Sequence, residues 1–150
     1  MLKINVPNTS KLIKSIGYFG EDAVKEVGKI TRLTALEMEA TAKTLAPIDN
    51  GTLRQSIRAE QAESPLDWKI TAYMPYSAYH EFGTGGLVDI KEDWGAMAAQ
   101  FKGKGIKQVN ISPKPFMYPA FVLGRKTYNK DLRELFKVLA KRFNNGQSAA

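Results

Sequence analysis

Apolar residues recur with helical spacing towards both ends of the chain and alternate with polar residues in its middle. From about Glu21 to Leu45 apolar and small residues return every three or four positions, which predicts a long helix. The residue before a proline is pushed out of the helical region, so Pro47 should end it. The predicted stripe is rich in Thr and Ala, which favours close packing over a bulky core. Its members are Val24, Val27, Thr31, Met38 and Leu45, with Ile30 and Thr34 beside them.

A second amphipathic pattern, from about Pro119 to Phe143, predicts the final helix. Proline suits the first turn of a helix, where its missing N–H costs nothing. The small, polar residues 144–150 are predicted to form a flexible tail. The apolar face holds Tyr128, Leu132, Leu135, Phe136, Leu139 and Phe143. The opposite, basic face holds Lys126, Lys130, Arg133, Lys137 and Lys141.

The middle of the chain predicts a small antiparallel sheet. Trp68–Met74 alternates and is rich in β-branched and aromatic residues, so it is predicted to be a strand, joined through residues 60–67 to a preceding antiparallel one. Thr52–Ala59 is compatible with a helical or an extended start. The short aromatic run Tyr76–Phe82 is interpreted as a further strand. Asp49-Asn50-Gly51 predicts a turn, because Asn and Gly tolerate positive φ.

These elements predict an α+β fold in one domain spanning residues 1–150. Its parts are a long N-terminal helix, a small antiparallel β-sheet, a long loop and a long C-terminal amphipathic helix. Residues 1–20 form an N-terminal segment with a helical piece over Ser10–Phe19. The irregular, glycine-containing residues 84–112 are predicted to be the long loop.

Composition removes several function classes. The chain has no cysteine and one histidine, which excludes thiolate chemistry and zinc sites built from several imidazoles. No apolar run approaches the roughly 20 residues of a membrane-spanning helix, and no secretory signal is expected at the N-terminus. His80-Glu81 is interpreted as a packed or surface histidine rather than an acid/base pair. We therefore predict neither an enzyme nor a cofactor or metal site.

Charge and length point towards assembly. The net charge is +7, and residues 119–144 hold seven basic and two acidic side chains, so a polyanion or an acidic partner is favoured. A helix of about 25 residues spans ~38 Å, whereas a compact domain of this length has a radius of gyration of ~15 Å. Each long helix should cross or leave the domain. We infer that other subunits cover part of its apolar surface.

Three segments together resemble a known family. They read A-P-I-D-N-G-T-L-R-Q-S-I from Ala46, Y-S-A-Y-H-E-F-G-T from Tyr76 and P-F-M-Y-P-A from Pro115. Their order and spacing, between a long helix and a C-terminal helix, resemble the gene-product-ten-like tail-completion proteins, minor tail components of the head–tail neck of tailed phages. The resemblance covers about residues 20–143. The motif residues are Pro47, Asp49, Gly51, Leu53, Arg54, Ser56, Ile57, Tyr79, Glu81, Phe82, Gly83, Thr84, Pro115, Phe116, Pro119 and Ala120.

Within the resemblance these residues are expected to maintain the fold. Pro47 and Gly51 would shape the exit from the first helix, while Leu53, Ile57 and Phe116 would be buried anchors. An inward Glu81 would need a cationic or backbone partner, and Arg54 is the cationic candidate. Gly83 would allow a turn after a strand, and Pro119-Ala120 would open the last helix.

The resemblance implies a virion structural protein that forms a homo-oligomeric ring in the neck or upper tail, between connector and tail tube. Its partners would be its own copies, the connector or head-closure protein, the tail terminator and the tail tube, with non-specific contact of the basic face with packaged DNA and no membrane. It would be located in the virion neck or tail, and in the host cytoplasm during assembly. Tail terminator and head-closure protein are alternatives within this class. A small basic DNA-binding accessory protein is the alternative outside it.

Overall fold

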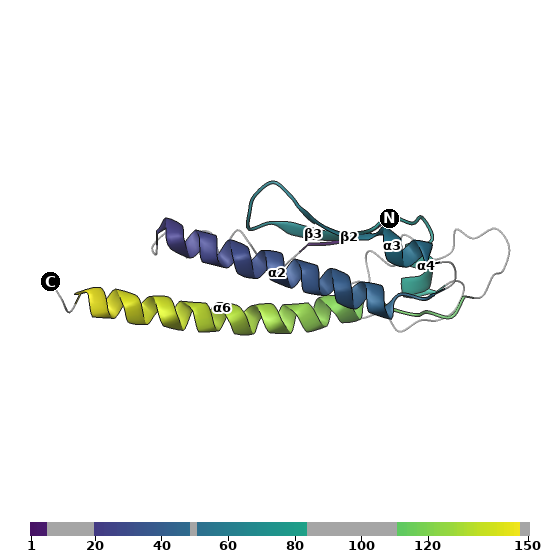
Figure 1. Ribbon diagram of the computed structural model, residues 1–150. Helices are drawn as coiled ribbons and strands as arrows, with labels where there is room; N and C mark the ends of the chain where they lie inside the picture. The colour runs from purple at the N-terminus through teal and green to yellow at the C-terminus, as the bar shows by residue number, and fades with distance from the viewer. Residues whose placement is uncertain (6–19, 49–50, 84–110, 148–150) are drawn as a thin grey trace.

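A computed structural model describes residues 1–5, 20–48, 51–83 and 111–147 of the chain. Over these residues the fold is α+β, as predicted (Figure 1). Two long helices lie side by side, and a three-stranded antiparallel sheet and two short helices complete the fold. The predicted helical piece over Ser10–Phe19 and most of the predicted loop over 84–112 lie outside the described residues.

Helix α2 (Glu21–Leu45) has the bounds that the sequence predicts. Glu21 and Asp22 in its first turn and Lys43 in its last suit the helix dipole. The chain leaves the helix at Ala46, which is extended with φ −61° and ψ 135° and precedes Pro47. The predicted stripe is only partly correct. Its members Val27, Thr31, Thr34 and Met38 are buried together with Ala23, Ala35 and Ala42, whereas Val24 and Leu45 are exposed.

The sheet contains β1 (Leu2–Asn5), β2 (Ile57–Gln61) and β3 (Trp68–Ala72) in the order β1-β3-β2. β2 and β3 form the predicted antiparallel pair, with Ile57 opposite Ala72 and Gln61 opposite Trp68. The third strand was not predicted. β1 lies antiparallel to β3, with Leu2 opposite Ala72, and is only four residues long, too short for its alternation to stand out.

Two short helices occupy the segments around the sheet. α3 (Thr52–Ser56) precedes β2 directly, so Thr52–Ala59 is both helical and extended. α4 (Ser77–Phe82) corrects the prediction of a strand over Tyr76–Phe82. Its buried residues are Ser77, Ala78, Glu81 and Phe82. They form two adjacent pairs four residues apart, and a helix places both pairs on one side, whereas a strand would turn the members of each pair to opposite faces.

Helix α6 (Met117–Gln147) is longer than predicted at both ends. It begins two residues before Pro119, which therefore lies in the first turn as expected, and it continues through residues 144–147, which were predicted to belong to the tail. Tyr128 and Leu132 are buried, and Leu135, Phe136 and Leu139 are partly buried, so the predicted apolar face is confirmed as far as Leu139. The Phe143 side chain lies outside the described part.

Helix α2 forms the middle layer of the molecule. Figure 1 shows the sheet on one side of α2 and α6 on the other, with α6 antiparallel to α2 and extending past its start. The edge strand β2 meets α2 through Glu39, whose carboxylate Oε2 accepts the Ala59 N–H at 2.6 Å and whose Oε1 pairs with Lys43. The core therefore spreads along a helix instead of filling a sphere.

Candidate functional site

The second and third motifs meet at the Glu81 carboxylate. Its Oε2 accepts the N–H groups of Phe116 at 2.8 Å and Met117 at 2.9 Å, and its Oε1 accepts that of Tyr118 at 2.9 Å. The first N–H groups of a helix have no partner within the helix, and the next residue, Pro119, has no N–H. Glu81 therefore satisfies every free donor at the start of α6.

The environment of Glu81 shifts its acidity. The side chain is 4% exposed, and burial raises the pKa of the carboxyl above its usual 4.5, while the three N–H groups act in the opposite direction. The sequence predicted that Glu81 needs either a cationic or a backbone partner, and its partners are backbone N–H groups. Arg54, the expected cation, instead directs its Nη2 to the carbonyl oxygens of Thr44 and Ala46, 3.5 Å from each.

Gly83 lies at the end of the second motif, against the residues that precede the third. Its φ is 73°, and a Cβ atom there would lie 2.8 Å from the carbonyl oxygen of Ile111. Only glycine therefore fits at this turn. The turn follows the helix α4, whereas the sequence predicted a strand before it. Beside it, the Lys114 N–H donates to the His80 carbonyl at 2.7 Å.

The first motif lies against the second. Gly51, with φ 73°, directly precedes α3, which contains the buried Leu53, and β2 begins with the buried Ile57. The Thr52 hydroxyl is 2.8 Å from the Tyr76 hydroxyl. The remaining motif residues are placed as follows: Phe82, Phe116 and Ala120 are buried, Pro47, Arg54, Ser56, Tyr79, Gly83 and Pro119 are half-buried, Pro115 is exposed, and Asp49 and Thr84 lie outside the described residues.

The two long helices approach closely along their shared face. The Thr31 hydroxyl is 3.2 Å from the Tyr128 hydroxyl, and burial raises the pKa of Tyr128 above 10.0. At Gly124 an added Cβ would collide with the Met38 side chain, whose Sδ would be 3.0 Å away. This contact matches the expectation that small residues permit close packing.

The predicted basic face is exposed along the side of α6 away from α2. All five side chains, Lys126, Lys130, Arg133, Lys137 and Lys141, are exposed. Within the described ranges none of them forms an ion pair; the four ion pairs there belong to α2 and to the β2–β3 hairpin. The positive charge of α6 is thus available to a partner.

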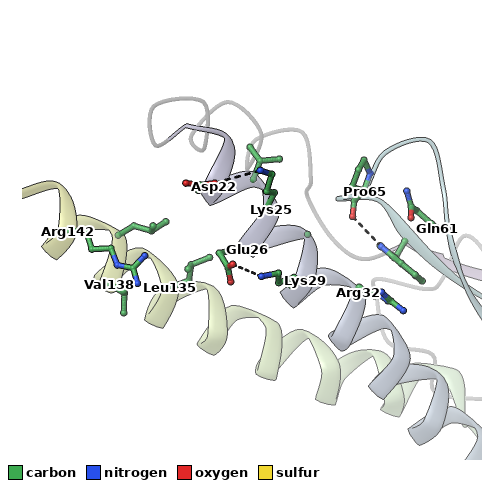
Figure 2. A pocket seen from close by; sticks show the side chains of 14 residues that line it. Asp22, Lys25, Glu26, Lys29, Arg32, Gln61, Pro65, Leu135, Val138 and Arg142 are labelled. Atoms are coloured by element: carbon green, nitrogen blue, oxygen red, sulfur yellow. Dashed lines mark hydrogen bonds and ion pairs between the residues drawn. The ribbon is translucent and has the colours of Figure 1, made fainter.

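A groove of about 1000 Å³ opens between the first half of α2, the C-terminal half of α6 and the β2–β3 hairpin (Figure 2). Its apolar lining includes Val24 and Val138, and Arg32 and Arg142 also line it. Asp22 and Glu26 also line it, each paired with a lysine one turn away on α2. The groove is open and mixed in charge.

Reactive groupings are sparse in the described part of the chain. No cluster of three His, Asp or Glu side chains there is placed to hold a metal ion. The His80 ring packs edge-on against Tyr76, with 5.7 Å between centroids, and its buried Nδ1 has no hydrogen-bond partner there. Among the described helices none is long and apolar enough to cross a membrane.

Comparison with protein-family models, with curated proteins and with solved structures finds no match for this chain.

Proposed function

We propose that this chain is a virion structural protein of the phage head–tail neck or upper tail, a tail-completion or minor tail component that assembles as a ring between connector and tail tube. The observation that carries the proposal is the convergence of the second and third motifs on Glu81. These motif residues hold the fold together and do not line a cleft with reactive groups. Such a role suits a structural protein that functions through contacts with other proteins.

The long helices support the same proposal. α2 and α6 lie side by side as an elongated pair, and each leaves large apolar side chains exposed, such as Leu33 and Leu123. Exposed apolar surface on a helix is typical of a contact between subunits. Copies of the chain and the neighbouring neck and tail proteins are the proposed partners, in the virion and in the host cytoplasm during assembly.

The position of the chain in assembled particles tests this proposal. An antibody against it should label the junction of head and tail in particles of the phage that encodes it, and mass spectrometry of purified particles should detect several copies. Label at the head side or at the tube side of the junction separates head closure and tail termination from tail completion. Absence from purified particles would overturn the proposal.

A DNA-binding accessory protein is the second candidate, and the exposed basic face of α6 favours it. Five cations on one helix face suit sequence-independent contact with phosphates. If four of them neutralise phosphates, affinity for a duplex should fall on the order of a hundredfold between about 50 and 200 mM salt. Absence of binding at the lower salt concentration would reject this candidate.

A further inference from the structure

The outer face of α2 carries an apolar ridge, defined here as Leu33, Leu36 and Ala40. Leu33 is 59% exposed, Leu36 is 42% exposed and Ala40 is also exposed. Spacings of three and four residues put the ridge on one stripe of the helix. The buried stripe of α2, which includes Thr34 and Met38, points the other way. In the described part of the chain, then, neither the sheet nor α6 covers the ridge.

Opposite charges flank this ridge. At 100° per residue, Arg32 lies about 70° to one side of its middle and Glu37 about 70° to the other side. Both side chains are exposed, and neither takes part in an ion pair among the described residues. Lys29 and Lys43 lie seven residues before and after Leu36, close to the line of the ridge, and each pairs with an acidic side chain of its own helix, Lys29 with Glu26 and Lys43 with Glu39.

We propose that the ridge packs against the same ridge of a second copy of this chain, with the two α2 helices parallel and in register. Leu33 and Leu36 then take the two core positions of a heptad, and Ala40 begins the next. Two positions flank the seam of such a pair: the residue before Leu33 and the residue after Leu36. Arg32 and Glu37 occupy them.

The charges select the direction of the pair. In a parallel pair each flank faces the opposite flank of the partner, so Arg32 of each copy meets Glu37 of the other. In an antiparallel pair like flanks meet, which would bring Glu37 against Glu37 and Arg32 against Arg32. Like charges at a contact are unfavourable, so the parallel arrangement is preferred.

The ridge is short beside the roughly 800 Å² per partner of a standard interface, so the pair is expected to be weak in dilute solution. This inference does not rest on the proposed function, because a DNA-binding protein could pair by the same surface. Cross-linking tests the ridge, whereas labelling of particles tests the function.

Single-cysteine cross-linking is a direct test, since the chain has no cysteine of its own. The variants Leu33→Cys, Leu36→Cys and Ala40→Cys should each give a disulfide-linked dimer on mild oxidation, because in a parallel pair every ridge residue faces its own counterpart. The control is Asn129→Cys on α6, an exposed polar position outside both the apolar and the basic face, and it should stay monomeric. Cross-linking at only one ridge position, or at none above the control, would overturn the proposal.

A charge swap tests the direction independently of folding. In the Leu36→Cys background, Arg32→Glu or Glu37→Arg alone should lower the yield of dimer about threefold, as expected for exposed ion pairs. The two changes together should restore it, since each copy again presents opposite charges. Far-UV circular dichroism checks that the helices persist. Unchanged yields in both single variants, or no recovery in the double variant, would contradict the parallel pair.

Discussion

Glu81 connects two elements that are 35 residues apart in the chain, and it does so with one side chain. A buried carboxylate is costly unless charged or strongly polar partners surround it. Here the partners are three backbone N–H groups at the positive end of a 31-residue helix. The sequence indicated that an inward Glu81 needs a partner. It could not indicate which, because the N–H groups come into reach only after α4 and α6 have docked.

Removing this carboxylate should loosen the start of α6. Glu81→Ala leaves three buried donors without an acceptor, and we expect the free energy of unfolding to fall by about 2–4 kcal/mol. Urea denaturation followed by circular dichroism measures the change. Glu63→Ala, on the exposed end of the β2–β3 hairpin, is the matched control and should change stability by less than about 0.5 kcal/mol. Equal effects in the two variants would argue against the cap.

The raised pKa of Glu81 gives stability a defined dependence on pH. The folded chain binds the proton of the Glu81 carboxyl more tightly than the unfolded chain does. The stabilisation from this proton is therefore fully present below pH 4.5, the usual pKa, and is lost as the pH rises through the raised pKa of the folded chain. The difference in stability between the wild type and Glu81→Gln should therefore shrink over that interval. Urea titrations at a series of pH values measure it. A difference that grows with pH would mean that the three N–H groups outweigh burial.

At the scale of elements, the close approach of α2 and α6 at Gly124 predicts that a larger residue there lowers the stability of the fold. Gly124→Ala improves helix propensity by up to about 1 kcal/mol but forces a methyl group into Met38, which costs about 1–3 kcal/mol. We expect a net loss in a thermal unfolding experiment. Gly28→Ala on α2 is the matched control, because its Cβ would lie 3.6 Å from Leu66, an ordinary contact, and it should stabilise the chain.

A double variant isolates the contact. Met38→Ala alone leaves a cavity worth about 2–5 kcal/mol. Combined with Gly124→Ala, the new methyl group occupies part of that space, so the two losses should sum to more than the loss in the double variant. Simple additivity would mean that the two helices separate at this point instead of sharing one packed site.

Periodicity predicted the two long helices and the β2–β3 pair well, but it missed β1 and misassigned α4. α2 and most of α6 follow from stripes that repeat over six or more turns. Tyr76–Phe82 was wrongly interpreted as a strand, because aromatic residues favour strands and the run covers fewer than two helical turns. Small residues misled in another way. Ala23, Ala35 and Ala42 carry little hydrophobic signal, but they are buried where α2 meets its neighbours, while Val24 and Leu45 are not.

At the scale of the whole molecule, the basic face of α6 can be separated from assembly. Changing Lys126, Lys130, Arg133 and Lys137 to Gln should leave the fold and the oligomeric state unchanged, because all four side chains are exposed and none is paired within the described ranges. On the proposed function, we expect impaired retention or passage of DNA in particles that carry the variant, measured as infectivity and as the DNA content of particles.

The control for that experiment removes equal charge elsewhere. Lys3, Lys25, Lys29 and Lys114 are exposed outside α6, and changing these four to Gln lowers the net charge by the same amount. Infectivity should then survive. If both quadruple variants behave alike, total charge matters and the position of the basic face does not.

The bond between Glu39 and the Ala59 N–H has a consequence for the life of the free chain. An incoming strand that approached β2 would have to displace a carboxylate held by Lys43 and would then bury it against its own backbone. Edge-to-edge addition of a strand from another chain is therefore opposed along β2. The free chain is therefore protected against edge-to-edge association through β2, which leaves its contacts with other chains to exposed side chains.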